Sequence, residues 1–239
     1  MPLPKISTPT YELVLPSSGK KVKYRPFLVK EEKILIMALE SEDTKQITSA
    51  IKSVLSDCIL SRGIKIDKLA TFDIEYLFLN IRGKSVGETV EVNVTCPDDG
   101  QTKVEMVIDI DSIKIQKDSN HSDIIRLDDS LSVQMNYPSL DQFIETNFDT
   151  SSNSQVDESL NVIMSCIKQV YNEEEAWEAS NCTKKELRDF VESMNSKQFK
   201  EVENFFETMP KLSHKVKVMN PNTKVESEVV IEGLASFFS

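Results

Sequence analysis

The amino-acid sequence predicts an α+β protein: an N-terminal hairpin and helices, a central antiparallel β region, and a C-terminal helical bundle closed by a second β-hairpin. Three observations carry this prediction. Apolar residues repeat with a helical period before residue 82, alternate with polar residues over 87–136, and return to a helical period over 139–210. Turn-rich segments interrupt short alternating runs at both ends of the chain.

The first element is a β-hairpin. Residues 11–15 alternate in the manner of a strand, Pro16–Gly19 supply a turn, and residues 22–24 form the returning strand before Pro26. Residues 30–40 have the composition of a helix. Their apolar side chains are so dense that we expect this helix to be largely buried.

Two further helices are predicted before the β region. The first runs from about Thr44 to Arg62, with a single apolar stripe at the helical period and Gly63 after its end. The second runs from Phe72 to Ile81, with Thr71 as its N-cap.

The central region is predicted to be β-rich because the apolar period changes to two after Gly83 and Gly87. Valines alternate over 90–94 and apolar residues over 104–110, on either side of a Pro-Asp-Asp-Gly turn at 97–100. Shorter strands are expected near residues 113–115, 124–127 and 131–135.

The C-terminal third is predicted to begin with helices. A capping-box pattern opens a short helix at Ser139. Three apolar stripes follow, and the middle one begins after a capping box at Thr183. The members of these stripes are Val156, Leu160, Ile163, Ile167 and Val170, then Leu187, Phe190, Val191 and Met194, then Val202, Phe205, Phe206 and Met209.

A hairpin around Asn220–Thr223 closes the chain. If it pairs with the N-terminal hairpin in one sheet, residues 1–239 form a single interwoven α+β unit, with a β-rich subregion at 87–136 and a helical subregion at 139–210.

Composition limits the kinds of function. The hydrophobic fraction of 39% and charged fraction of 28% are typical of a soluble protein, and no apolar run is long enough to cross a membrane. The N-terminus has no apolar signal region, so we expect the protein to be made in a cytoplasm. A net charge of −11 argues against nucleic acid as a partner.

Charge is distributed unevenly along the chain. Residues 1–36 hold seven basic and three acidic residues, a net charge of +4, whereas residues 145–207 hold six basic and fourteen acidic residues, a net charge of −8. Such asymmetry steers and orients charged partners. Two solvated faces that keep the protein soluble are the plainer alternative.

The sequence offers no complete catalytic or cofactor site. Neither His121 nor His214 belongs to a recognisable nucleophile motif, and the six glycines form no phosphate-binding loop. Cys96 opens a turn that resembles half of a zinc knuckle, but Asp99 stands in place of the second thiol. We therefore expect no catalytic residues, no metal and no cofactor.

Candidate protein-contact residues lie near the two ends of the chain. Tyr24, Arg25 and Phe27 lie in the basic N-terminal segment, and the chain closes on an apolar tail. The tail residues are Leu234, Phe237 and Phe238. An intramolecular core role is an equally good alternative for each of the six. Trp177 would be a further anchor for a partner if it proved exposed.

Several segments of the chain are similar to a family of phage tail proteins. They are Leu15–Lys21, Tyr24–Leu35, Asn80–Glu88, and the closing Glu232–Leu234 with Phe237 and Phe238. Together they resemble the T4-like phage tail family of baseplate hub or base plate proteins, over nearly the full chain.

The resemblance implies a non-enzymatic protein needed to build the hub of a contractile tail baseplate. Its partners would be other hub proteins, with self-association as a further alternative and with no nucleic acid and no membrane. It would be found in the host cytoplasm during assembly and in the virion. Three alternatives remain: a transient assembly chaperone absent from the finished virion, a metal-stabilised module, and a hydrolase with a scattered site.

Overall fold

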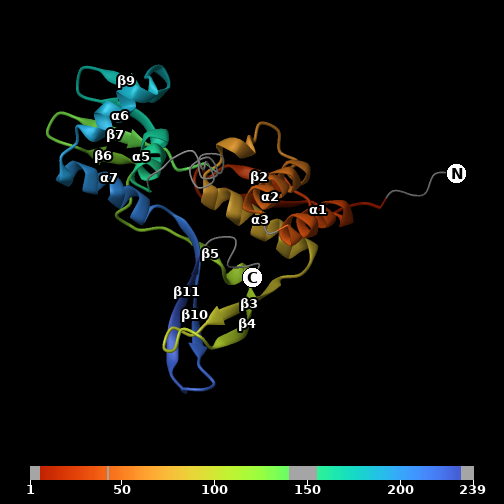
Figure 1. Ribbon diagram of the computed structural model, residues 1–239. Coiled ribbons are helices and arrows are strands. Elements are labelled where there is room, and N and C mark those ends of the chain that lie inside the picture. The colour runs from red at the N-terminus through yellow and green to blue at the C-terminus, as the bar shows by residue number, and fades with distance from the viewer. Residues whose placement is uncertain (1–5, 42, 140–154, 233–239) are drawn as a thin grey trace. The chain divides into compact units, whose positions relative to one another are not determined.

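A computed structural model describes residues 6–41, 43–139 and 155–232 (Figure 1). These residues form helices and several small antiparallel sheets, so the predicted mixture of α and β structure is confirmed. The chain divides into two units. The first comprises residues 1–66, 72–116 and 211–239, and the second comprises residues 67–71 and 117–210. The prediction of one interwoven unit stays a prediction.

The first unit combines three helices with three small sheets. Its elements are β1 (Tyr11–Val14), β2 (Lys21–Tyr24), α1 (Val29–Glu40), α2 (Thr44–Cys58), α3 (Thr71–Ser85), β3 (Thr89–Thr95), β4 (Lys103–Asp109), η2 (Ile110–Ser112), β5 (Lys114–Gln116), β10 (Lys211–Met219) and β11 (Glu226–Glu232). The short helix η1 (Ile66–Lys68) spans a boundary between the units in sequence. The N-terminal and C-terminal hairpins belong to separate sheets among the described strands, so the possible pairing between them is not found there.

The β1–β2 hairpin is held against α3 by a buried acid. The carboxylate of Asp73, in the first turn of α3, accepts hydrogen bonds from the backbone N–H of Ser17 at 3.0 Å and from the Ser17 hydroxyl. Burial raises the pKa of Asp73, and the two bonds from Ser17 partly offset this effect. The predicted turn at Pro16–Gly19 therefore also fixes the hairpin to the helix.

Two helix ends differ from their predicted positions. Helix α2 ends at Cys58 rather than Arg62, because Ile59 turns extended and pairs with Tyr24 while the Leu60 N–H donates to the Lys23 carbonyl at 2.8 Å. Helix α3 continues past Ile81 to Ser85. The Gly83 within it faces Ile110, whose side chain would lie only 3.4 Å from an added Cβ atom, so the missing side chain permits close packing.

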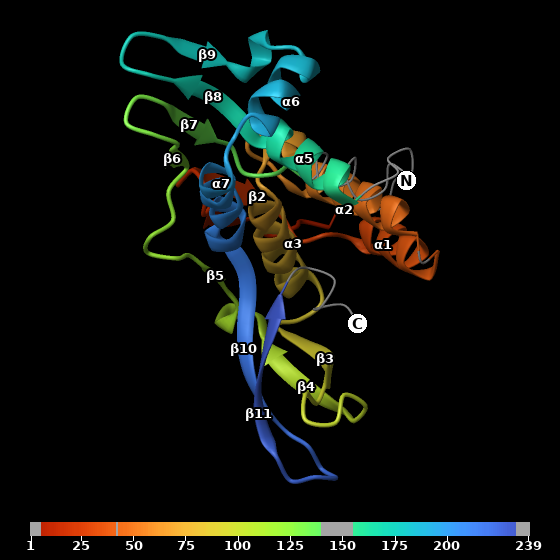
Figure 2. The same ribbon diagram turned by 60° about the vertical axis from the view of Figure 1, so that its left-hand side comes forward.

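Hairpins β3–β4 and β10–β11 share one hydrophobic core, and their ribbons lie side by side in Figure 2. Leu79 of α3 packs at this core with the valines of β3 and with Leu212, Val216 and Val218 of β10. Strand β10 pairs with β11 over seven residue pairs and with β5 over three. The alternation predicted for these strands is confirmed.

The tips of the two hairpins have the same backbone geometry. In each turn the N–H of the fifth residue donates to the carbonyl of the first at 2.9 Å, from Gly100 to Cys96 and from Lys224 to Asn220. Both fifth residues have a positive φ, 66° and 62°. Lys224 is the only non-glycine residue in the described chain with a positive φ. Because a side chain makes this backbone conformation unfavourable, other contacts must hold the turn in place.

Those contacts form a network that we call the turn clasp: Asp98, Asp99, Thr102, Asn220, Asn222 and Thr223. The amide of Asn220, which is fully buried, donates to both oxygens of Asp98 at 3.0 and 3.1 Å and to Asp99 at 2.9 Å. The Thr223 hydroxyl also donates to Asp98, and Asn222 donates to Thr102. Hydrogen bonds thus join the two turns at the positions where a zinc knuckle would use thiolates.

The second unit packs helices with a four-stranded sheet in the order β6-β7-β8-β9. Its elements are β6 (Ile124–Arg126), β7 (Ser132–Met135), α5 (Gln155–Cys166), β8 (Ile167–Tyr171), β9 (Ala176–Glu178), η3 (Ala179–Asn181), α6 (Lys184–Glu192) and α7 (Ser196–Thr208). Phe205, Val133 and Cys166 lie at its core. The capping box predicted at Thr183 is present, whereas the helix predicted to open at Ser139 falls largely outside the described residues.

Two strands interrupt the segment 139–210 that was predicted to be a helical bundle. The apolar stripe predicts a helix that continues through Ile167 and Val170. Helix α5 ends at Cys166 instead, and Ile167 and Val170 belong to β8. The side chain of Asn172 accepts the N–H groups of Glu174 and Glu175 at 2.9 and 2.6 Å and so closes a turn into β9. Branched side chains followed by this turn favour a hairpin that pairs with β7, and this pairing overrides the helical pattern.

We predict that Asn220→Ala destabilises the first unit by about 2 kcal/mol, because it removes a fully buried amide that donates to the exposed carboxylates of Asp98 and Asp99 and leaves the N–H groups of Asn222 and Thr223 without their acceptor. Urea unfolding followed by circular dichroism measures the loss. The matched control is Asn222→Ala, which removes one exposed bond and should cost less than about 0.5 kcal/mol. Equal losses in the two variants would contradict the proposed role of Asn220.

Candidate protein-contact site

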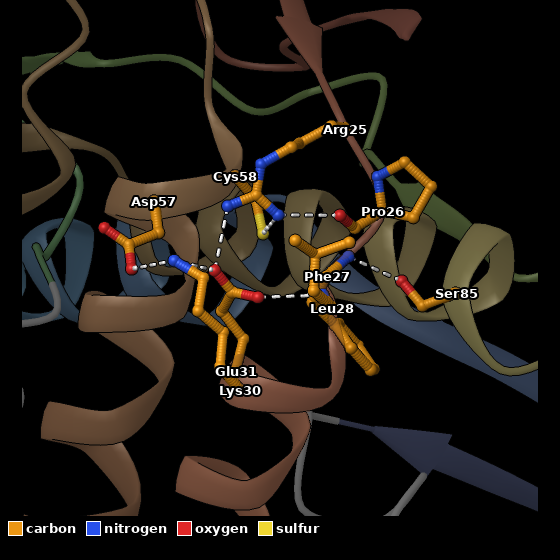
Figure 3. Close-up of polar contacts among 9 residues, drawn as sticks. All are labelled: Arg25, Pro26, Phe27, Leu28, Lys30, Glu31, Asp57, Cys58 and Ser85. Atoms are coloured by element: carbon orange, nitrogen blue, oxygen red, sulfur yellow. Dashed lines mark hydrogen bonds and ion pairs between the residues drawn. The ribbon is translucent and has the colours of Figure 1, made fainter. Parts of the chain in front are cut away.

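The predicted contact residues of the N-terminal segment lie mainly inside the first unit. Tyr24 is 2% exposed and Phe27 is 9% exposed, and the Tyr24 ring lies 5.8 Å from that of Tyr11. Arg25 follows the end of β2 and turns its side chain toward α1 and α2 (Figure 3). This placement favours the alternative in which all three serve the fold of the chain, and their contact with a partner stays a prediction.

Arg25 forms an ion pair with Glu31, whose side chain is fully buried (Figure 3). Arg25 Nη2 donates to Glu31 Oε1 at 2.8 Å, and Arg25 Nη1 donates to the Pro26 carbonyl at 2.9 Å and to Cys58 Sγ at 3.7 Å. The other carboxylate oxygen of Glu31 accepts the N–H of Leu28 at 2.8 Å. Glu31 therefore caps the first turn of α1 and ties it to the end of β2.

Neighbouring contacts extend this attachment to the other helices. The backbone N–H of Arg25 donates to the Cys58 carbonyl of α2 at 3.0 Å, and the N–H of Phe27 donates to Ser85 Oγ of α3 at 2.9 Å. Lys30 lies 3.1 Å from Glu31 and 3.9 Å from Asp57 of α2. The segment between β2 and α1 is thus bonded to both α2 and α3.

The electrostatics of Glu31 follow from this geometry. Burial alone would raise the pKa of its carboxyl group, but hydrogen bonds from Arg25, from the Leu28 N–H and from Lys30 outweigh burial and lower the pKa to about 2. Burial raises the pKa of the nearby Cys58 thiol to about 11, more than Arg25 lowers it, so this thiol is not an activated nucleophile. The network is therefore an attachment for a helix and lacks the features of a reaction centre.

Helix α1 itself exposes most of its large apolar side chains, contrary to the expectation that it is largely buried. Val29 is 80% exposed and Met37 is 60% exposed, whereas only Glu31 and Ala38 of the helix are buried. We call the exposed set the α1 apolar face: Leu28, Val29, Ile34, Ile36, Met37 and Leu39. The expectation was wrong because a polar group, Glu31, occupies the position of α1 that faces the core.

The α1 apolar face is the strongest candidate contact surface among the described residues. The continuous apolar run over residues 34–39 places apolar side chains on every side of the second half of α1, a pattern that normally lies in a protein interior. Exposed apolar patches of this kind mark interaction sites. Sequence reasoning singled out the neighbours Tyr24, Arg25 and Phe27 instead. The apolar density of residues 28–39 is the sequence signal for this surface, but the same density is also typical of a core helix. The tail residues Leu234, Phe237 and Phe238 lie outside the described residues.

The two histidines have structural roles in packing and strand pairing. His121 Nδ1 lies 2.9 Å from the Thr208 hydroxyl and Nε2 lies 3.1 Å from the Tyr137 hydroxyl, with the Phe205 ring 5.1 Å away. Burial lowers the pKa of His121, with a smaller contribution from Lys117. His214 lies in β10, paired with Ile231 of β11.

The described cysteines and acids form no metal centre. Cys58, Cys96 and Cys166 are buried free thiols, and within residues 6–41, 43–139 and 155–232 no three His, Cys, Asp or Glu side chains form a group that could hold a metal ion. The turn clasp explains why the knuckle-like turn at Cys96 is ordered without a second thiol.

Trp177 meets the condition that makes it a candidate anchor. It is 42% exposed on β9, where the β8–β9 turn also carries Glu173, Glu174 and Glu175. A partly exposed Trp at the edge of a sheet is typical of an interface anchor.

A comparison with protein-family models matches residues 8–239 to the family described as T4 bacteriophage base plate protein. The match covers nearly the whole chain, includes residues of both units, and confirms the resemblance to this family that the sequence indicated. Neither the comparison with curated proteins nor the comparison with solved structures found a match.

We predict that Glu31→Gln lowers the free energy of unfolding by about 3 kcal/mol at pH 7, because it replaces a fully buried carboxylate and leaves the partly buried guanidinium of Arg25 without its ionic partner. The lowered pKa of Glu31 stabilises the folded state above the pKa of an unfolded Glu, about 4.3, and this contribution disappears as pH falls toward 2.

Urea unfolding at pH 7 and pH 3 measures both effects, with Glu32→Gln as the neighbouring control that should change little. The difference between wild type and Glu31→Gln should shrink at the lower pH. A constant difference would show that the ionised Glu31 does not stabilise the fold.

Proposed function

We propose, from the premise that this chain belongs to the T4 bacteriophage base plate protein family, that it is a non-enzymatic protein of the contractile tail's baseplate hub. The protein acts in hub assembly through contacts with other hub proteins. It works in the host cytoplasm during assembly and is carried in the tail baseplate of the virion.

The α1 apolar face is the observation that supports this proposal most directly. Leaving Val29, Ile36 and Met37 in water costs free energy that another protein would recover by covering them, at roughly 25 cal/mol per Å² of apolar surface. The ion pair between Arg25 and the buried Glu31 fixes the start of the helix before any partner arrives. A helix that is already positioned loses less conformational entropy on binding than one that must first order.

Other observations agree with a contact protein. The two histidines are placed by packing and strand pairing, and the buried Cys58 and Cys166 thiols have pKa values raised to about 11 and about 12 by burial. In the described part of the chain, no helix has the length and apolar composition that crossing a membrane requires.

A transient assembly chaperone would use the same surface but leave before completion. Quantitative mass spectrometry of purified virions separates the two roles. We expect this chain in a fixed ratio to the other hub proteins. Its absence from virions, together with its presence in hub precursors, would assign it to the chaperone role instead.

We predict that Ile36→Glu/Met37→Glu abolishes assembly without unfolding the chain. Both positions are exposed, so the unfolding midpoint should move little, but two carboxylates buried against an apolar partner surface should weaken binding more than a hundredfold. The measurement is the amount of each hub protein recovered with the tagged variant from infected cells, relative to wild type.

The matched control is Val107→Glu/Val230→Glu, which places the same charges on exposed valines of β4 and β11. It should recover hub proteins as wild type does. If the α1 variant recovers them equally well, the α1 apolar face is not the contact.

The tail residues Leu234, Phe237 and Phe238 remain part of the proposal. Phe237→Ser/Phe238→Ser should reduce recovery of hub proteins at an unchanged unfolding midpoint if the tail contacts a partner. A lowered midpoint in the isolated protein would instead place the two phenylalanines in the chain's own core.

A further inference from the structure

We propose that strand β9 is a second interaction surface, at which an extended, lysine- or arginine-bearing segment of another baseplate protein adds to the β6-β7-β8-β9 sheet. We call this surface the β9 edge and define it as Glu173–Glu178. The inference rests on the proposed function, because it assumes contacts with other baseplate proteins, but it names a different surface and the chemistry of the partner.

The first argument is a row of apolar side chains that crosses the whole sheet. Ile125 of β6 lies opposite Val133 of β7, Val133 lies opposite Val170 of β8, and Val170 lies opposite Trp177 of β9. Ile125 and Val133 are buried and Val170 is partly buried, whereas Trp177 is 42% exposed. The apolar row therefore continues to the edge strand, where its last and largest member is left partly in water.

The second argument is the open edge of β9. This strand is the last in the sheet order, and its only strand partner among the described residues is β8. An edge strand presents backbone N–H and C=O groups with which an added strand can pair. All three residues of β9 are exposed, and among the backbone groups of this strand the Glu178 carbonyl accepts a hydrogen bond from the Cys182 thiol at 3.5 Å.

The third argument is charge, which identifies the occupant. Glu173, Glu174, Glu175 and Glu178 are all exposed, and no ion pair joins them to a basic side chain within the described residues. Asn172 fixes the turn from which three of them project. Unneutralised acids around an apolar anchor complement a segment in which basic and apolar residues alternate.

The same charge argues against other classes of partner. Residues 145–207 carry a net charge of −8, which would repel the phosphates of nucleic acids and of anionic lipids. Backbone pairing at a strand edge is a property of polypeptides. A basic, extended protein segment can therefore pair with the edge strand, cover Trp177 and complement the charge of the acidic residues.

Trp177 provides a site-specific reporter, because it is the only tryptophan in the chain. The probe is a synthetic peptide, acetyl-Lys-Val-Lys-Ile-Lys-Val-Lys-amide, titrated into the full-length protein. We expect a shift of the Trp177 emission to shorter wavelength as its ring is covered, and slower hydrogen exchange at the amides of residues 176–178. A second peptide, with proline in place of the three apolar residues, keeps the charge but cannot add a strand.

Matched variants test the role of charge. Glu173→Lys/Glu174→Lys/Glu175→Lys should weaken binding of the first peptide at least tenfold, about 1.4 kcal/mol. Glu201→Lys/Glu203→Lys/Glu207→Lys makes the same change of net charge at exposed positions of α7 and should leave binding within about twofold of wild type. Circular dichroism confirms that both variants are folded.

Three results would overturn the inference: no binding to the wild-type protein, equal binding by the proline peptide, or equal weakening by the two triple variants. The outcome is separable from that of the proposed function. Ile36→Glu/Met37→Glu should bind the peptide normally, so a failure at the β9 edge leaves the α1 result unaffected. Conversely, peptide binding would persist if the α1 apolar face were found to have no role in assembly.

Discussion

The buried carboxylate of Glu31 is the group on which the arrangement of the N-terminal helices depends. It accepts hydrogen bonds from a guanidinium, a backbone N–H and a lysine, and through Arg25 it is linked to α2. A buried charge of this kind tolerates few alternative geometries, because any other position leaves it unpaired. Helix α1 is therefore held by specific polar contacts, and this frees its apolar side chains from a role in the core.

The second unit also leaves apolar side chains exposed outside its core, but on a sheet and not on a helix. There the apolar row from Ile125 to Trp177 begins under helices and ends at a strand with no described neighbour on its outer side. In both units the apolar pattern of the sequence extends beyond what the described chain covers. A net charge of −11 gives such a molecule a means of remaining dispersed until its partners are present.

Local signals explain what the sequence predicted well. The hairpins at residues 11–24, 89–109 and 211–232 were predictable because alternation and turn residues act over a few positions. The end of α5 at Cys166 was not, because the stripe through Ile167 and Val170 fits a helix, and only pairing with β7, distant in sequence, selects the strand. The exposure of α1 was missed for a related reason: apolar density indicates that a surface will be covered, but not by which chain.

The contact residues illustrate the same limit. Tyr24 and Phe27 were marked by their basic surroundings, yet they pack inside the first unit, and the side chains on the next helix are the ones exposed. Nothing local in the sequence shows that Glu31, rather than an apolar residue of α1, faces inward, since that depends on Arg25 and Cys58 arriving from other elements. Trp177 was recognisable as a candidate because a single large aromatic residue lies next to a run of acids.

The turn clasp has a consequence for how the chain matures. The turn clasp is a non-covalent cross-link between two hairpin tips, and it consists of amide, hydroxyl and carboxylate groups. It closes as soon as the tips meet, so its rate of formation does not depend on the concentration of any added ion or oxidant. The conditions that break this link therefore differ from those that break a metal site. Hydrogen bonds from Thr223 and Asn220 lower the pKa of Asp98, so the link holds near neutral pH and loosens in acid, whereas a thiolate-bound metal would yield to a chelator.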